Sequence, residues 1–508
     1  MASRRDELNA YTFAKRRLIS QFLQPTSTGT EEGAPQPLRA VWPGAVMAIV
    51  ILAAFGAWGM FKPTAPKDWD TAEEKVIVAD KSTTRYVVLK PERKGGKPVL
   101  HPVLNLASAK LLLTPDKGEV VKVKESVIDG SDLPHGATIG IPYAPDRLPE
   151  ADDAGEAKRW AVCERPAQGN RSVQKAAFVL AERDRAEVDG KGRLRAKDVL
   201  YVQGPDDKDY VVDHRGTKYP VDGSHELLIR SVVNAGAKPQ RVSAQWLNTL
   251  HTGDEIGFPE VPGLGRPARI DDLDLSLNTI GTILEARAGG HNERYIVLRD
   301  RVAPISDFAS NLILSADDEV QPSGEPEKVT PGAFTPTGSD FDAGFDWPKA
   351  ITEGANSAEV AAGSRNTVCN VLRNVDESDP RRTTLSTWVG ERYPISLPAG
   401  STSAYVTPGT GLLYRQVTGT SAKAGATFLV TDTGLRYALQ SNGDSTGADP
   451  GAGTSEKEQE QAMRETRDAQ TRLGYGDVKP AIVPLAWSEF LPTGPRLSTS
   501  DARQPQGS

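Results

Sequence analysis

Few residues of this 508-residue chain are spaced for catalysis. A Gly-x-Ser-x-Gly pattern occurs at Gly443–Gly447, but a nucleophile elbow needs a sharp strand-to-helix turn with oxyanion donors. Here the pattern lies in an acidic, Gly- and Ser-rich segment, so we interpret it as a chance match. The Gly-Lys pairs at 96–97 and 190–191 are followed by Pro98 and Gly192 rather than Ser or Thr, so neither is a phosphate-binding loop. We therefore predict no catalytic residue and no cofactor site.

Metal-ligand spacing is also absent from the sequence. The six histidines show no His-x3-His or Cys-His arrangement of the kind that binds zinc. Asp340, Asp342 and Asp346 surround Gly344 in a way that resembles a calcium loop, but the bidentate glutamate is missing at its expected position. We interpret these carboxylates as the acidity of a linker and predict no metal site. The histidines are His101, His135, His214, His225, His251 and His291.

Cysteine usage indicates a covalent link rather than reactivity. Only two cysteines are present. Cys163 follows the apolar residues 160–162, and Cys369 lies in a more polar setting. An even number of cysteines in a domain outside the cytoplasm indicates one disulfide, and closing a loop of about 200 residues removes roughly 5 kcal/mol of unfolded-state entropy. Two buried free thiols are the alternative.

The element that positions everything else is the uncharged stretch Val41–Phe61. It has about the length that a helix needs to cross the hydrocarbon core, and Trp42 and Trp58 lie near its two ends, where aromatic rings prefer the headgroups. A cleaved signal peptide begins nearer the N-terminus and has a shorter apolar run. A late signal peptide and a buried core helix are the alternatives. We predict one transmembrane helix at 41–61.

Charge predicts the orientation of this span. Lys and Arg accumulate before it, although Lys62 and Lys67 follow it closely, and long domains translocate largely regardless of charge. We expect the N-terminal segment to be cytoplasmic and the body of about 450 residues to lie outside, divided into several domains because it is too long for one core. A net charge of −7, with no basic face interleaved with aromatics, does not favour nucleic acid as a partner.

The segment from Glu7 to Gln24 has apolar residues at helical spacing beside a basic run. A basic amphipathic helix next to a membrane is typical of contact with anionic headgroups or with a partner protein, and a solvated helix without a partner is the alternative. The apolar positions are Leu8, Tyr11, Ala14, Leu18 and Phe22. The candidate partner-binding residues are Tyr11, Phe13, Arg16 and Arg17.

Internal repetition is the most informative feature of the body. The segments LPHGATIGIP (133–142) and LHTGDEIGFP (250–259) share one pattern, and LPTGP (491–495) is a shorter copy. Trp246 and Trp487 each lie four residues before the leucine of such a copy. We attribute the glycines to unusual backbone angles and the prolines to strand ends.

A second recurring unit precedes these endings. Apolar runs joined by Asp- and Gly-containing turns predict hairpins at 210–220, 295–304 and 428–438. Helix-like stretches follow at 105–113, 225–234, 306–314 and 473–487. Four hairpin-plus-helix copies are therefore predicted, with chance similarity of amphipathic hairpins as the alternative.

The predicted fold class is α+β: a single transmembrane helix and a multi-domain extracytoplasmic body of four small α/β repeat domains around a central domain. The predicted ranges are 1–40 for the cytoplasmic amphipathic helix and linker, 41–61 for the span, 62–75 for a stalk, 76–150 for repeat 1, 151–195 for a central part, 196–262 for repeat 2, 263–320 for repeat 3, 321–397 for a second central part, 398–500 for repeat 4 with a disordered insertion at about 440–465, and 501–508 for the tail.

Several motifs together resemble the EccB family, the single-pass membrane component of the type VII (ESX) secretion system. The resemblance covers nearly the whole chain in order. The motifs are Tyr11-x-Phe13-x-x-Arg16-Arg17 before one span, residues 105–109 (NLASA), 140–142 (GIP) with Ala144-Pro145, Trp160-x-Val162-Cys163, residues 280–283 (IGTI) and Leu491-Pro492-x-Gly494-Pro495-x-Leu497-Ser498.

The resemblance implies four repeat domains around a disulfide-closed central domain. It also implies assembly with an EccC-type ATPase, the membrane subunits EccD and EccE and a mycosin protease, and self-association through the extracytoplasmic body. The expected function is therefore that of a structural component of the secretion complex in the cell membrane. The family is sometimes described as an ATPase, which leaves a nucleotide hydrolase as an alternative; a cell-wall binding module is another, since repeated domains suit multivalent attachment.

Overall fold

The computed structural model describes residues 4–23, 38–61, 65–91, 95–167, 172–271, 273–288, 290–316, 324–397, 403–422, 425–439 and 456–506. The chain forms two compact units, Met1–Pro66 and Lys67–Ser508. The first unit contains α1 (Arg4–Leu23) and α2 (Leu38–Phe61). α2 includes the predicted span. Among the described residues, however, no helix meets the length and hydropathy that a membrane crossing requires, so the span stays a prediction.

The second unit is a mixed α+β body. Its described strands form five sheets, which we name the first, second, third, fourth and central sheets. The first is β3-β2-β1-β4, the second is β10-β7-β8-β9-β11 with β16 on β7, the third is β14-β13-β12-β15, the fourth is β22-β21-β20-β23 and the central one is β18-β17-β5-β6-β19.

Strand bounds for the first, second and third sheets are β1 (Lys75–Ala79), β2 (Arg85–Leu89), β3 (Val99–Val103), β4 (Glu119–Val123), β7 (Asp198–Gln203), β8 (Asp209–Val212), β9 (Thr217–Val221), β10 (Gln240–Arg241), β11 (His251–Thr252), β16 (Glu353–Gly354), β12 (Ile283–Ala288), β13 (His291–Leu298), β14 (Arg301–Ile305) and β15 (Glu327–Val329). Those of the fourth and central sheets are β20 (Gly411–Val417), β21 (Thr427–Thr431), β22 (Arg436–Ala438), β23 (Ala481–Pro484), β5 (Arg159–Pro166), β6 (Val173–Leu180), β17 (Thr367–Val375), β18 (Thr383–Gly390) and β19 (Ala404–Val406). The helices of this unit are α3 (Leu106–Leu111), α4 (Glu125–Asp129), α5 (Ala151–Gly155), η1 (Glu182–Asp184), α6 (Ala186–Asp189), α7 (Glu226–Val232), α8 (Ala244–Leu247), α9 (Asp307–Ser315), α10 (Glu456–Arg472), α11 (Leu485–Ser488) and α12 (Thr499–Ala502).

The four numbered sheets share one order of elements. In each, three consecutive strands form an antiparallel meander, a helix follows, and a further strand returns to pair in parallel with the first strand of the meander. The helices in this position are α3, α7, α9 and α10. The hairpins predicted at 210–220, 295–304 and 428–438 are confirmed as β8-β9, β13-β14 and β21-β22.

The repeated sequence endings run beside the third strand of each meander. Residues of 133–142 bridge to β3, Ile256 bridges to Val221 of β9, and Thr493 bridges to Arg436 of β22. The third sheet has an equivalent segment, because Thr337 N–H donates to Val302 O at 2.9 Å beside β14. That segment was not recognised in the sequence as a copy.

The glycines of these endings serve close packing. A Cβ at Gly136, Gly253 or Gly494 would come within 3.0 Å of a side-chain ring on the adjacent strand. These rings belong to His101, Tyr219 and Tyr437. The three glycines do not have positive φ. The prediction of unusual backbone angles is therefore wrong for these three glycines, each of which is required because an aromatic ring lies against its Cα. It is confirmed for Gly140 of the first ending, whose φ is +131°.

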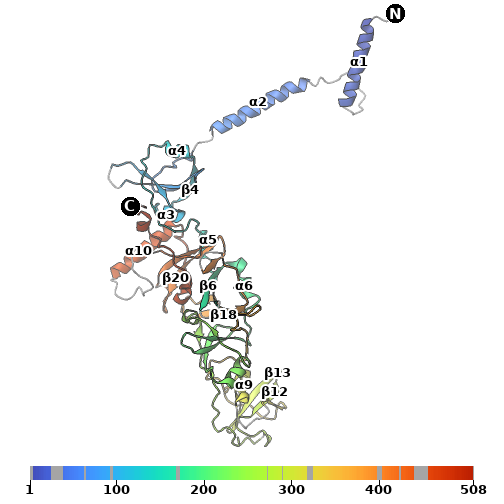
Figure 1. The fold of residues 1–508 in the computed structure, drawn as a ribbon, viewed down its shortest axis with the longest axis vertical. Coiled ribbons are helices and arrows are strands. Elements are labelled where there is room, and N and C mark those ends of the chain that lie inside the picture. Colours follow the sequence, from blue (N-terminus) through green and yellow to red (C-terminus); the bar gives the residue numbers. More distant parts are fainter. Residues whose placement is uncertain are drawn as a thin grey trace. The chain divides into compact units, whose positions relative to one another are not determined.

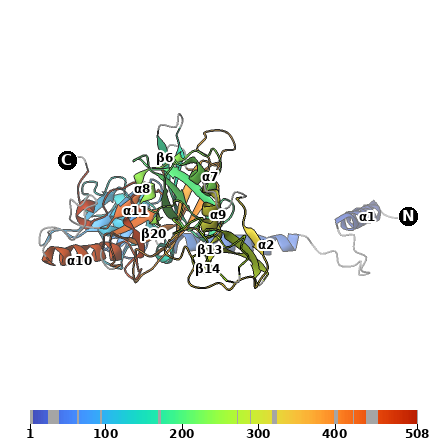
Figure 2. The ribbon, with the colours of Figure 1, turned by 90° about the horizontal axis from the view of Figure 1, so that it is seen from below.

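The sheets pack in pairs. The first and fourth sheets share one core with α3 and α10, and the C-terminal α12 packs on α3. In Figure 1 the blue strands of the first sheet lie next to these red segments. The second and third sheets share another core, in which α7 packs on α9 (Figure 2).

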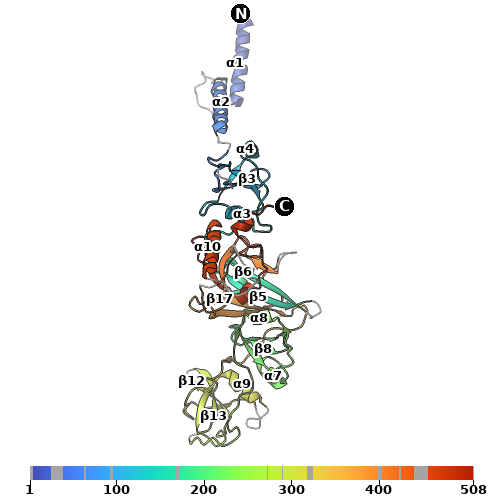
Figure 3. The same ribbon diagram turned by 90° about the vertical axis from the view of Figure 1, so that its left-hand side faces the viewer.

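The central sheet joins these two pairs. One of its faces forms a single core with the second and fourth sheets, and Figure 3 shows β5, β6 and β17 between α10 and α8. Its opposite face has a smaller core that includes both cysteines.

Several predicted boundaries differ from the strand pairing. Residues 321–397 were assigned to the central part, but β15 and β16 within this range pair with β12 of the third sheet and β7 of the second. β19, assigned to repeat 4, pairs with β6 of the central sheet. The insertion predicted at about 440–465 lies outside the described residues up to 455, and α10 begins at Glu456. Short strands far from their partners along the chain leave little local pattern, which explains these differences.

Candidate functional site: the central sheet and its junctions

The central sheet is closed by a disulfide between its two middle strands. Cys163 of β5 and Cys369 of β17 are register partners and are joined by a disulfide across 206 residues. Both side chains are fully buried. Because successive residues of a strand point to opposite faces, Cys163 faces the smaller core while Val162 faces the larger one. The bond therefore links β5 and β17 on the face of the central sheet opposite the second and fourth sheets.

Two tryptophans attach neighbouring sheets to the larger face. Trp246 of α8 and Trp487 of α11 each follow the returning strand of their own sheet, and both are fully buried in the same core as Trp160 of β5. Trp246 Nε1 donates a hydrogen bond to Val162 O at 3.1 Å. Truncating a buried tryptophan typically costs about 3–5 kcal/mol. The matching positions noted in the sequence are thus anchors of the second and fourth sheets.

A buried carboxylate reinforces the α8 anchor. Glu164 of β5 is fully buried, and it accepts hydrogen bonds from Ser243 N at 2.8 Å and from Ser243 Oγ. Ser243 is the N-cap of α8, and its Oγ also accepts from Trp246 N at 3.2 Å. Burial raises the pKa of Glu164 more than the two hydrogen bonds from Ser243 and the charge of Lys175 lower it. This residue was not predicted from the sequence as a functional residue, although a glutamate within an apolar strand is a recognisable signal.

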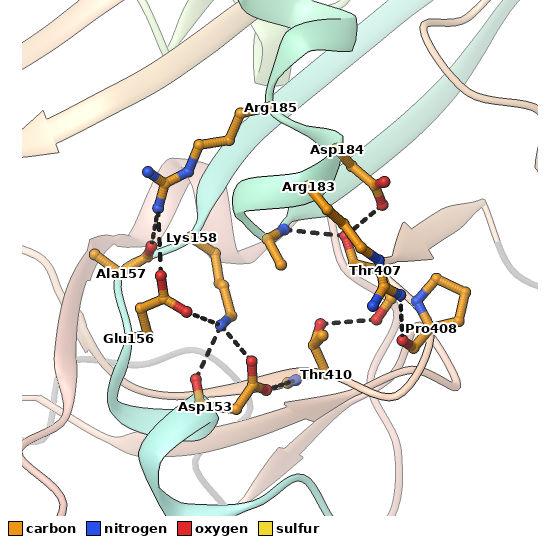
Figure 4. Close-up of polar contacts among 12 residues, drawn as sticks. Asp153, Glu156, Ala157, Lys158, Arg183, Asp184, Arg185, Thr407, Pro408 and Thr410 are labelled. Atoms are coloured by element: carbon orange, nitrogen blue, oxygen red, sulfur yellow. Dashed lines mark hydrogen bonds and ion pairs between the residues drawn. The ribbon is translucent and has the colours of Figure 1, made fainter.

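A polar network lies at one end of the central sheet, where the chain enters β5 and where it leaves β6 and β19 (Figure 4). The side chain of Lys158, fully buried, donates from Nζ to Asp153 Oδ1 at 2.7 Å, to Asp153 O at 2.9 Å and to Glu156 Oε2 at 3.2 Å. Asp153 Oδ2 accepts from Gly411 N of β20 at 2.8 Å. A buried cation is tolerated only when it is paired and hydrogen-bonded, as Lys158 is. This half of the network connects α5 with the fourth sheet.

The other half of the network centres on Thr407. Its Oγ1 donates to Asp184 Oδ2 at 2.7 Å and accepts from Ala181 N at 3.0 Å. Arg183 Nη2 donates to Pro408 O at 2.6 Å. The segments after β6 and after β19 are therefore fastened to each other. In both halves the charged groups bond to polar groups of other segments, so the network couples these segments structurally.

The predicted partner-binding residues lie on α1, which has no buried residue. At 3.6 residues per turn, Phe13, Arg16 and Arg17 fall on one side of the helix, whereas Tyr11 falls on the other side with Leu18 and Phe22. Tyr11 and Phe13 are 71 % and 68 % exposed. The helix thus presents two different faces, and it does not bring the four predicted residues together on one face.

The aspartates that resembled a calcium loop have another explanation. Asp342 is buried, and it accepts from Lys349 Nζ at 2.7 Å and from Ser306 N at 3.2 Å. Burial alone would raise its pKa, but the hydrogen bonds from Lys349 and Ser306 outweigh burial and lower it. The interpretation of all these residues as linker acidity is wrong for Asp342, because it fixes the start of α9. No cluster of three or more potential metal ligands occurs within the described ranges.

An open cleft of about 1000 Å³ lies in the second sheet, between β7, β8 and α7. At one side Tyr201 Oη donates to Asp209 Oδ2 at 2.5 Å, and Gln203 Nε2 donates to Asp209 Oδ1 at 3.1 Å. Burial and the neighbouring Asp209 raise the pKa of Tyr201.

The Gly-x-Ser-x-Gly segment at 443–447 lies outside the described residues.

The fold and these junctions define a modular assembly protein, in which small sheets of one topology are fastened around a disulfide-closed sheet. The family model described as "Type VII secretion system ESX-1, transport TM domain B" matches residues 1–507. The chain therefore belongs to the EccB family of type VII secretion.

Proteins with names from the same family are similar to this chain. The chain is 27 % identical over 470 residues to a protein of Mycolicibacterium smegmatis named ESX-3 secretion system ATPase EccB3, covering 87 % of this chain and 83 % of that protein. It is 25 % identical over 492 residues to ESX-2 secretion system ATPase EccB2 of Mycobacterium tuberculosis, covering 89 % and 90 %.

Two solved structures have the same fold. One is described as an EccB3 dimer from the ESX-3 core complex; it has a TM-score of 0.54 and 23 % identity, over 84 % of this chain and 99 % of that one. The other is a chain of a structure described as an intact ESX-5 inner membrane complex. It has a TM-score of 0.55 and 20 % identity, over 100 % of this chain and 96 % of that chain.

Proposed function

We propose that this chain is a structural core component of an ESX secretion complex in the cell membrane. Residues 41–61 cross the membrane once, α1 lies on the cytoplasmic side, and the body from Lys67 onward scaffolds the extracytoplasmic side. Support comes from the uncharged sequence of the span, the excess of Lys and Arg before it and the family description as a transport transmembrane domain.

The observation that carries the proposal is the double docking on the central sheet. Trp246 and Trp487 lie in one core with the central strands, and the polar groups of the junction bond to one another. Such an arrangement holds domains at fixed positions, which is what a scaffold requires. The body then assists the assembly of the translocation channel by presenting surfaces at defined spacing.

The proposed partners are an EccC-type ATPase, the membrane subunits EccD and EccE, a mycosin protease and further copies of this chain. The solved relatives named above are described as an inner membrane complex and as a dimer, and these descriptions support both complex formation and self-association. On α1, the residues proposed to contact partners or the membrane are Tyr11, Phe13, Arg16 and Arg17.

The relatives' names include the word ATPase, so nucleotide hydrolysis is the second candidate function. The full sequence contains no Gly-x4-Gly-Lys-Ser/Thr motif for phosphate binding. We assign ATP hydrolysis in the complex to the EccC-type partner. Purified chain that hydrolyses ATP, and that loses the activity through a point substitution, would instead support an intrinsic enzyme.

A labelling experiment tests the topology. Single cysteines are introduced at Ser20 of α1 and at the exposed Asp132, and intact cells are treated with a membrane-impermeant maleimide. The native cysteines are buried in a disulfide and do not react. The proposal predicts labelling of D132C in intact cells and of S20C only after permeabilisation. Labelling of S20C in intact cells would contradict it.

A further inference from the structure

The contact between α8 and the central sheet depends on a chain of polar groups that begins at a buried carboxylate. Glu164 accepts hydrogen bonds from the backbone N–H and the hydroxyl of Ser243, and Ser243 is the N-cap of α8. Trp246 of α8 donates a hydrogen bond to the backbone oxygen of Val162, which lies two residues before Glu164 on β5. Figure 3 shows α8 beside β5. The ionisation of Glu164 therefore acts directly on the anchor of the second sheet.

No salt bridge to Glu164 is present among the described residues. Lys175 of β6 is its register partner, but Lys175 Nζ donates to Gln245 Oε1 at 2.9 Å and lies 6.0 Å from the centre of the Phe490 ring. From β17 the register partner is the apolar Val368. Arg165 follows Glu164 on β5 and lies over the ring of Tyr393, 5.6 Å from its centre. In the described part of the chain, Lys175, Arg165 and Tyr393 are thus titratable or charged groups near this carboxylate.

Other titratable groups lie elsewhere in the same interface. His251 Nε2 is 3.0 Å from Thr383 O of β18, and Thr387 Oγ1 donates to Asp213 O at 2.8 Å. His214, next to Asp213, has a buried Nδ1 without a hydrogen-bond partner, and burial lowers its pKa. A histidine of lowered pKa destabilises the docked state as the pH falls, which is opposite to the effect expected of Glu164.

The sign of the Glu164 effect follows from linkage. Burial raises the pKa of Glu164 above its ordinary value of 4.5 when α8 is docked. Between 4.5 and the raised value, the docked state binds more protons than the undocked state. Docking is therefore strongest at the acidic end of this window, weakens as the pH rises through it and is constant above it.

We propose that Glu164 makes the attachment of the second sheet to the central sheet proton-dependent. With Glu164 protonated, α8 is held tightly; with Glu164 ionised, the buried charge loosens α8. The third sheet shares a core with the second. The positions of both sheets relative to the central sheet therefore depend on the protonation state of Glu164. The fold thereby contains a joint that responds to extracytoplasmic pH.

Hydrogen–deuterium exchange of the full-length chain in mild detergent tests this joint. Peptides covering residues 240–250 are compared between wild type and E164Q at pH 5, 6, 7 and 8, and E260Q serves as a matched variant at an exposed glutamate. Comparing proteins at the same pH cancels the intrinsic exchange rate and the contribution of His214.

One unit of pKa displacement corresponds to about a tenfold change in the docking equilibrium. We expect the ratio of wild-type to E164Q exchange to rise by about threefold or more between pH 5 and pH 8, and the ratio of wild type to E260Q to stay constant. A constant wild-type to E164Q ratio would overturn the proposal.

If residues 240–250 of E164Q exchange rapidly at every pH, a second variant tests the proposal. S243A removes one donor to the carboxylate while keeping Glu164, so it moves the pH midpoint of exchange in residues 240–250 upward relative to wild type. A purely structural role of Ser243 would increase exchange without moving that midpoint. An unmoved midpoint would therefore contradict proton control by Glu164.

Discussion

Three buried ionisable side chains lie where separate segments of the body meet. Glu164 accepts hydrogen bonds from Ser243, the N-cap of α8, Lys158 joins α5 to the fourth sheet through Asp153, and Asp342 fixes the start of α9 with Lys349. A buried ionisable group is costly when it has neither a hydrogen-bond partner nor a charged partner, so each of these groups requires its partner segment to be in place. They make the body specific about which segments dock together.

The contacts that fasten these segments to one another could largely not be predicted from the sequence. Thr407 bonds to Asp184, 223 positions away, and Gly411 bonds to Asp153, 258 positions away. Nothing in the local pattern around Thr407 identifies Asp184 as its partner, because the contact depends on the pairing of β19 with β6. By contrast, the two cysteines had only each other as partners, so their pairing could be predicted.

The disulfide gives a prediction at the residue scale. The double variant C163A/C369A leaves small apolar side chains in the core but removes a link across 206 residues. The free energy of unfolding falls by about 2–5 kcal/mol because the unfolded chain becomes less restricted. Thermal unfolding of the full-length protein without reductant measures this as a lower midpoint.

Reduction supplies the control for that variant. Dithiothreitol added to unfolding wild-type protein brings its midpoint towards that of C163A/C369A and leaves the variant unchanged. Equal midpoints for wild type and variant in the absence of reductant would show that the bond contributes nothing to stability.

At the scale of elements, the meander, helix and returning strand form one recurring unit. The hairpins were predictable because apolar residues alternate on both sides of short turns. The returning strands were not, because β10 has two residues, β15 has three and each pairs with a strand far back along the chain. Most of the four units could therefore be recognised, but not the sheets that complete them.

The glycine of the recurring ending gives a prediction at this scale. In G253A, the new Cβ would come within 3.0 Å of the ring of Tyr219, a side chain that is 3 % exposed. Displacing this ring costs about 1–3 kcal/mol, as overpacking of a core does. The measurement is the thermal midpoint of the full-length chain, which we expect to fall.

G257A is the matched control, because it lies in the same ending and a Cβ there meets nothing within 4 Å. Its midpoint should equal or exceed that of wild type, since replacing glycine with alanine restricts the unfolded chain. Equal losses in the two variants would mean that backbone conformation, and not the tyrosine ring, requires the glycine.

At the scale of the whole molecule, α1 and the body have separate tasks in the proposed scaffold. α1 is exposed along its length, and the body is held together by shared cores and by the groups around the central sheet. Charge reversal in R16E/R17E should therefore weaken contacts made by α1 and leave the body folded. Unchanged thermal unfolding of this variant checks the second half of that expectation.

The most direct test of the scaffold is affinity purification of the full-length chain from membranes in mild detergent, followed by mass spectrometry, for wild type and R16E/R17E in parallel. The proposal predicts that wild type recovers a large complex with an EccC-type ATPase and a multi-span membrane subunit, and that the variant recovers less of both. Recovery of wild type alone, under conditions that preserve other membrane complexes, would contradict a role as a structural core component.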